Sequence, residues 1–258
     1  MDPHSYELVK GDGELFDRAD VIFFNGLGLE HGASLQRRLK EVRVISLGDQ
    51  LFMECPQDFI ISDGAVDPHF WEDVSLFSRC VDIIVYQLGE QAPSLERVFT
   101  ERGERLKKKL AIADAEFLVR FSELPESARR LVTSHDAFAY FCRRYLAQEN
   151  REAWRECAIA PEGLAPDGQM SLGDIQKVCD FLEKSSAPVL FPESNLSSAA
   201  LNKISWICHQ RGFHVQVCET PIYGDTMGEV SSDYLDMMEH NAKTICQALS
   251  DARIECND

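Results

Sequence analysis

The chain has 258 residues, of which 45% are hydrophobic and 27% are charged. This balance is typical of a globular protein, and the length allows one large domain or two lobes of ordinary size. No apolar run approaches the roughly 18 to 20 residues that a transmembrane helix needs. The formal net charge of −17 repels phosphate backbones, so nucleic acid is excluded as an expected partner.

Cysteine usage says little about function. The nine cysteines include no Cys-x-x-Cys pair, so a zinc knuckle built from thiolates is not expected. Several cysteines fall on apolar faces of expected elements, where this residue behaves as a small buried hydrophobe. The chain begins Met-Asp-Pro-His, without the basic and apolar regions of a signal peptide, so no leader is expected within it.

Strand-like and helix-like segments alternate along the chain from Phe16 onward. Short apolar or β-branched runs predict strands at Ala19–Asn25, Val42–Leu47, Leu131–Ser134, Glu152–Ala158, Val189–Phe191 and His214–Cys218. Apolar residues at helical spacing predict helices at Ala33–Glu41, Phe70–Leu88, Ala137–Leu146, Ser171–Glu183, Ser198–Arg211 and Asp233–Leu249. Repeated β–α units of this kind indicate parallel sheets covered by helices, which is the α/β class.

A long polar helix is expected from about Ser94 to Leu124, because no glycine or proline follows Gly103 until Pro125. At 1.5 Å per residue this helix would be about 45 Å long, which suits a strut between lobes. We therefore expect an N-terminal α/β lobe over residues 1–93, a linking helix over residues 94–129 and a C-terminal α/β lobe over residues 130–258.

Two copies of the tripeptide Asp-Pro-His are present, ending at His4 and His69 and followed by Ser-Tyr and Phe-Trp. Proline restrains the residue before it to an extended conformation, so each histidine is presented from a stiff, non-helical loop. A single Asp-Pro-His would carry little information, since most single histidines are structural or solvated. Two copies with aromatic residues behind them favour a shared role.

Two further candidates, His135 and Asp225, each follow an expected strand. Ligands of open α/β sheets bind just beyond the carboxyl ends of the strands, where both residues would lie. Taken alone, His135 could equally be a helix-start residue beside Asp136, and Asp225 could be a turn former between glycines.

The four candidates together match the coordination chemistry of a divalent transition metal. Three neutral imidazoles and one carboxylate satisfy a borderline ion at about 2.0–2.2 Å per bond. Four protein ligands close the coordination sphere, which suits capture better than catalysis. The other histidines, His31, His209, His214 and His240, lie without such partners and are expected to be structural.

An ordered series of motifs carries a family resemblance. It comprises Asp2-Pro-His-x-Tyr6, Ala19-Asp-Val-Ile-Phe-Phe-Asn-Gly-Leu-Gly-Leu-Glu30, Asp67-Pro-His-Phe-Trp71, Thr133-Ser-His-Asp-Ala-Phe-x-Tyr-Phe141 and Asp225-Thr-Met-Gly228. The series spans nearly the whole chain and resembles the metal-binding solute receptors of bacterial ABC importers, the TroA/ZnuA group.

The resemblance implies two α/β lobes joined by one long rigid helix, with one ion in the cleft between the lobes. It implies that His4 and His69 ligate this ion from the first lobe. His135 and Asp225 would do so from the second lobe, with Glu193 supporting a ligand from behind. Manganese-type members tend to carry a glutamate where this chain has His135, which favours the zinc or mixed-metal branch.

The resemblance also implies a partner and a location. The chain would be a monomeric, non-enzymatic receptor that delivers zinc, manganese or iron to an ABC permease, in the periplasm or at the outer face of the inner membrane. Family members have a strand, a helix and another strand before the first Asp-Pro-His, whereas His4 is almost the first residue here. The first lobe is therefore expected to be N-terminally truncated, with His4 on a frayed end.

Two alternatives remain open on the sequence. A zinc-dependent hydrolase could use the same histidines, but it would need an open coordination position and a general base. The sequence contains no His-Glu-x-x-His motif and no nucleophile elbow. A surface interaction protein with an incidental ion site is the third reading.

Overall fold

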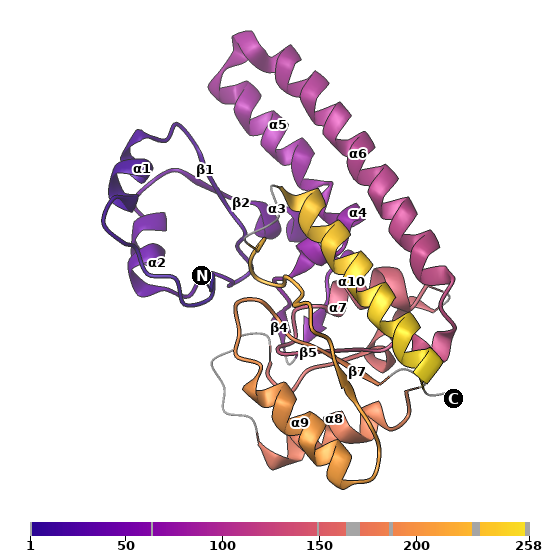
Figure 1. The fold of residues 1–258 in the computed structure, drawn as a ribbon. Helices are drawn as coiled ribbons and strands as arrows, with labels where there is room; N and C mark the ends of the chain where they lie inside the picture. The colour runs from indigo at the N-terminus through magenta and orange to yellow at the C-terminus, as the bar shows by residue number, and fades with distance from the viewer. Residues whose placement is uncertain are drawn as a thin grey trace. The chain divides into compact units, whose positions relative to one another are not determined.

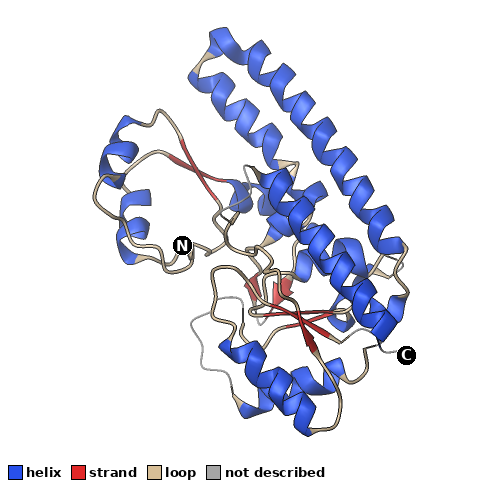
Figure 2. Cartoon of the chain, in the orientation of Figure 1, coloured by secondary structure: helices blue, strands red, loops and turns tan. Residues whose placement is uncertain are grey.

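The computed structural model describes residues 2–62, 64–148, 150–163, 171–185, 188–228 and 233–255. The chain divides into two compact units, Met1–Ile112 and Ala113–Asp258, and the division falls within the long helix α6 (Glu96–Ser122). Helices form most of the regular structure, and the strands are short (Figures 1 and 2). Within the described residues, no helix is both long and apolar enough to cross a membrane.

The first unit opens with a β–α–β arrangement. After α1 (Asp12–Arg18), the parallel strands β1 (Ile22–Phe24) and β2 (Val44–Ser46) pair side by side, and α2 (Ala33–Leu39) connects them. The sequence predicted both strands and α2, but not α1. That helix buries no residue, so its sequence carries no apolar periodicity to detect.

A short helix follows β2 without a loop. In α3 (Leu47–Glu54) the Ser46 side chain accepts a hydrogen bond from the Asp49 backbone N–H and so caps the first turn. After a 3₁₀ turn (Pro56–Asp58), the two-residue strands β3 (Ile61–Ser62) and β4 (Ala65–Val66) form an antiparallel hairpin that ends just before the second Asp-Pro-His motif.

The single helix predicted for Phe70–Leu88 is wrong. The segment forms a 3₁₀ turn (Phe70–Glu72), α4 (Val74–Phe77) and α5 (Cys80–Gln91). The break lies at Asp73, whose backbone is extended and whose carboxylate accepts hydrogen bonds from two N–H groups of α4. An aspartate in this position caps a new helix instead of continuing the old one.

The long helix expected from about Ser94 is observed as α6, preceded by a 3₁₀ turn (Pro93–Leu95). It packs closely against α5 at Gly103, where an added Cβ would lie only 2.6 Å from the Val85 side chain. The glycine therefore permits the two helices to approach each other.

The second unit contains a four-stranded parallel sheet in the order β6 (Ala158–Ile159), β5 (Leu131–Thr133), β7 (Val189–Phe191) and β8 (Gln216–Val217). The helices α8 (Leu172–Leu182) and α9 (Ala199–Gln210) cover one face, and α10 (Tyr234–Glu255) covers the other (Figure 1). β5 and β7 are buried throughout, as expected for strands covered on both faces.

Two predictions in the second unit need correction. Most of the strand expected at Glu152–Ala158 is a 3₁₀ helix (Arg151–Glu156), because this charged segment carries no alternating apolar face; only its end joins β6. The segment expected to form one α-helix at Ala137–Leu146 is α-helical only in α7 (Ala139–Phe141). It continues as a π-helix (Cys142–Leu146). A 3₁₀ turn (Glu126–Ala128) precedes β5.

Candidate metal centre

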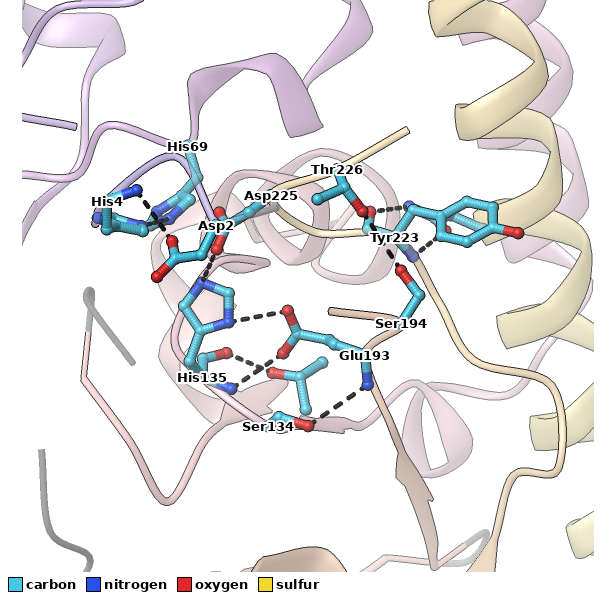
Figure 3. A network of polar contacts seen from close by, with 12 residues as sticks. Asp2, His4, His69, Ser134, His135, Glu193, Ser194, Tyr223, Asp225 and Thr226 are labelled. Carbon is cyan, nitrogen blue, oxygen red and sulfur yellow. Dashed lines mark hydrogen bonds and ion pairs between the residues drawn. The ribbon is translucent and has the colours of Figure 1, made fainter. Parts of the chain in front are cut away.

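The first unit brings His4 and His69 together although 65 residues separate them. Their Nε2 atoms lie 3.3 Å apart, and the two rings are tilted by 49° to each other. Figure 3 shows the two side chains close together. Two ligands of a tetrahedral zinc, each about 2.0–2.1 Å from the metal, would lie about 3.3–3.4 Å apart. The observed separation is therefore compatible with two ligands of one ion.

In the second Asp-Pro-His motif, the aspartate contacts both the backbone and the ring of the histidine. The Asp67 carboxylate accepts a hydrogen bond from the His69 backbone N–H at 2.9 Å and lies 2.7 Å from His69 Nδ1. A carboxylate in this position keeps the proton on Nδ1 and leaves the Nε2 lone pair available to a metal. Sequence reasoning overlooked this role of Asp67, and the signal was the aspartate two residues before the histidine.

The first motif uses its aspartate differently. Asp2 accepts the His4 backbone N–H at 2.9 Å and the Ser5 hydroxyl at 2.7 Å, which closes a turn around the proline (Figure 3). In both motifs, therefore, the aspartate shapes the loop that presents the histidine.

The frayed end expected around His4 is not observed. The His4 carbonyl accepts the His31 backbone N–H at 3.0 Å. Further along, the Glu7 carboxylate accepts the Ala33 and Ser34 backbone N–H groups at 2.7 and 2.8 Å, which caps the start of α2. Contacts beyond the motif therefore anchor the terminal segment, and the sequence pattern gave no hint of them.

In the second unit, His135 lies between two carboxylates. Its Nε2 is 3.2 Å from Asp225 Oδ2, and its Nδ1 is 2.8 Å from Glu193 Oε2, as the dashed lines in Figure 3 show. The Nε2–Oδ2 separation again equals the edge of a small coordination polyhedron. All three side chains come from loops that follow β5, β7 and β8.

Glu193 also fixes the backbone at His135. Its Oε1 accepts the His135 N–H at 2.9 Å, and its own N–H donates to the Ser134 hydroxyl at 3.4 Å. Gly224 provides the room for this carboxylate, since an added Cβ there would lie 2.5 Å from Glu193 Oε2. Glu193 thus orients both the ring and the loop of His135.

The two carboxylates control the charge of His135. Burial disfavours the imidazolium, but the hydrogen bonds to Asp225 and then to Glu193 outweigh it and raise the pKa of His135 to about 10. Without an ion, this imidazole carries a proton at neutral pH. A metal ion that binds Nε2 must displace that proton.

The loop that carries Asp225 is fixed by α10. The buried Asn241 side chain accepts the Tyr223 N–H at 2.9 Å and donates to the Tyr223 carbonyl at 2.7 Å. His240, expected to be structural, stacks on the Tyr223 ring at 4.3 Å and bonds to the Pro221 carbonyl. Sequence reasoning missed Asn241, because a lone asparagine within a helix gives no pattern to detect.

Each unit thus holds a pair of metal-type donor atoms, and each pair has a histidine backed by a carboxylate. A helix-covered parallel sheet combined with such donors defines the class of metal-binding solute receptors. The family model described as "Zinc-uptake complex component A periplasmic" matches residues 1–248, and the chain belongs to this ZnuA family. This membership places it among metal-uptake receptors and not among hydrolases.

Several relatives share most of their length with the chain. Metal-binding protein YtgA of Chlamydia trachomatis serovar D is 35% identical over 259 residues, covering 99% of this chain and 78% of that protein. Zinc-binding protein TroA of Treponema pallidum is 29% identical over 255 residues (97% and 79%). Manganese-binding lipoprotein MntA of Bacillus subtilis is also 29% identical over 255 residues (96% and 79%).

Solved structures agree with this assignment. The fold is similar to Fe(III)-bound YtgA from Chlamydia trachomatis, with a TM-score of 0.89 and 35% identity over 96% of this chain and 87% of that one. It is also similar to the periplasmic zinc-binding protein TroA from Treponema pallidum, with a TM-score of 0.83, 29% identity and the same coverages. The likeness to TroA and to chlamydial YtgA supports the expected two-lobe α/β architecture.

Proposed function

We propose that the chain captures one divalent transition-metal ion, zinc, manganese or iron, and delivers it to the permease of an ABC importer. His4 and His69 of the first unit and His135 and Asp225 of the second would complete one coordination sphere. The observation that carries this proposal is the spacing of 3.3 and 3.2 Å between the donor atoms within the two pairs. Ligands of one small metal ion have this separation.

The donor types support a borderline transition metal. Imidazole nitrogens suit zinc, iron and manganese far better than calcium or magnesium, which prefer oxygen ligands. The relatives are named for zinc, for manganese and for iron(III), so the family supplies no single ion. Three imidazoles to one carboxylate favour zinc or a mixed-metal site.

A closed set of four protein ligands favours capture over catalysis. A catalytic zinc keeps a position for water or substrate and needs a general base beside it. Here the Glu193 carboxylate, which contacts His135, already hydrogen-bonds to the ring and the backbone of that residue. We therefore propose that the chain is not an enzyme.

The proposal extends to location and assembly. The family is described as periplasmic, and several relatives are lipoproteins or substrate-binding components of metal ABC transporters. We propose that the chain acts in the periplasm or at the outer face of the inner membrane. It would act as a monomer, with the permease as its protein partner.

A metal titration tests the proposal. Metal-free protein is titrated with zinc, manganese(II) and iron(II) against a competing chelator, and elemental analysis counts the bound ions. One ion per chain is expected, and His69→Ala should weaken binding by at least about 100-fold, since it removes a ligand. The control, His209→Ala, removes an exposed histidine of α9 and should bind normally. Unchanged affinity in both His69→Ala and Asp225→Ala would refute the site.

A further inference from the structure

The core of the second unit contains two cysteine side chains in direct contact. Cys179 of α8 and Cys208 of α9 are both fully buried, and their Sγ atoms lie 3.3 Å apart. They belong to the apolar cluster that packs these two helices onto the sheet. The proposed metal capture uses neither thiol.

A short approach would convert this contact into a covalent bond. A disulfide has an S–S length of about 2.05 Å, so the two sulfurs need to move together by about 1.3 Å. Rotation about the two Cα–Cβ bonds changes this distance, and the two sulfurs already contact each other from adjacent helices. The family is described as periplasmic, and disulfides form and persist in that compartment.

We propose that Cys179 and Cys208 form a disulfide that links α8 to α9. Two S–H bonds break and one S–S bond forms, so the chain loses two protons and two electrons. The oxidant is a compound or protein that contains a disulfide. Its S–S bond accepts both electrons and both protons and becomes a dithiol. This inference does not depend on metal capture.

The timing of this reaction follows from burial. Burial and the neighbouring Cys179 thiol raise the pKa of Cys208 to about 12, so the folded chain contains almost no thiolate at this position. An external oxidant also has no access to two fully buried sulfurs. The thiol–disulfide exchange therefore takes place during folding, before α8 and α9 have packed together. Burial then protects the finished bond from reductants.

The bond would brace the part of the chain that serves the metal centre. The segment between Cys179 and Cys208 contains β7 and Glu193, the carboxylate that orients His135. Cross-linking the helices on either side of β7 closes this segment into a loop and restricts the unfolded chain. The cross-link would then restrict the movement of Glu193 during local conformational fluctuations of the second unit.

Peptide mapping tests the inference directly. The full chain is exported to the periplasm of a bacterial host, purified without reductant, denatured and alkylated before proteolysis. A peptide pair linked through Cys179 and Cys208 is expected, and it should disappear on reduction. Recovery of both cysteines in alkylated form, or linked to other partners, would overturn the proposal. Cys55 and Cys80, a buried pair of the first unit, are scored in the same digest for comparison.

A thermal test provides a second readout. Mild unfolding in the presence of reductant should lower the Tm of the wild-type chain by roughly 5–10 °C, as expected for loss of one cross-link. Cys179→Ala and Cys208→Ala should each lose this response to reductant. The control, Cys246→Ala, removes a half-buried thiol of α10 and should keep it. An identical Tm for the wild-type chain after mild unfolding with reductant and after mild unfolding without it would contradict the link.

Discussion

Replacing Glu193 with glutamine should separate two effects that this carboxylate has on metal binding. The wild-type carboxylate accepts the Nδ1 proton of His135 at 2.8 Å, which makes Nε2 a better donor to a metal. The same carboxylate also helps to raise the pKa of His135 to about 10, which favours the competing proton. Glu193→Gln keeps the size of the side chain and removes its charge.

The two effects depend differently on pH. In the wild-type chain the metal must displace a proton from His135 at every pH below about 10, so apparent affinity should rise by up to about tenfold per pH unit from neutrality upward. An ordinary histidine would level off near pH 6.5. At pH 7.5 the proton therefore weakens wild-type binding by about two to three orders of magnitude. In Glu193→Gln the pKa of His135 should fall, so this competition should weaken.

The variant should accordingly bind nearly as well as wild type close to pH 6.5. At pH 9 proton competition weakens wild-type binding only about tenfold, so the lost orientation should leave the variant up to about 10-fold weaker. The assay is a chelator-competition titration with zinc at half-unit pH steps, in buffers that do not bind metal. Proton release on binding, measured by calorimetry in buffers of different ionisation enthalpy, should also be smaller for the variant. A constant ratio of affinities across this range would refute the reasoning about proton competition.

Three other substitutions test single contacts. Asp67→Asn should weaken metal affinity about 10–100-fold with little change in Tm, because the buried amide cannot hold the His69 tautomer in the same way; competition titration measures it. Asn241→Ala should cost about 1–3 kcal/mol of unfolding free energy, measured by urea denaturation, since it leaves the Tyr223 backbone groups unpaired. Gly32→Ala should lower both Tm and metal affinity, because its Cβ would overlap the Tyr6 carbonyl oxygen; an unchanged Tm would show that the terminal segment is not anchored there.

Much of the fold could be predicted from local sequence. β5 and β7 are fully buried parallel strands, so their short β-branched and apolar runs stand out, and the residues after them follow from the rule for open α/β sheets. That rule also placed His135 and Asp225 beyond the ends of strands. The long helix was predictable because no glycine or proline interrupts the segment between Gly103 and Pro125.

Features that depend on distant partners could not be predicted in this way. The break before α4 depends on the Asp73 carboxylate finding two N–H groups of the next turn, which the apolar spacing conceals. The anchoring of His4 depends on Glu7 reaching α2, which starts 26 residues later. Asn241 is a similar case, since its partner lies 18 residues earlier in a loop. Each contact depends on tertiary packing, about which a local sequence pattern contains no information.

The donor pair of the second unit, His135 and Asp225, lies in a negatively charged environment, and this has a consequence for release. His69 is backed by the Asp67 carboxylate, and His135 contacts both Asp225 and Glu193. The second pair therefore attracts a proton as well as a metal, and protonation of His135 leaves its Nε2 lone pair unavailable. Acidification should thus weaken the hold of His135 on the ion. The carboxylates that help the second unit to bind a metal therefore also favour the proton that competes with the metal at His135.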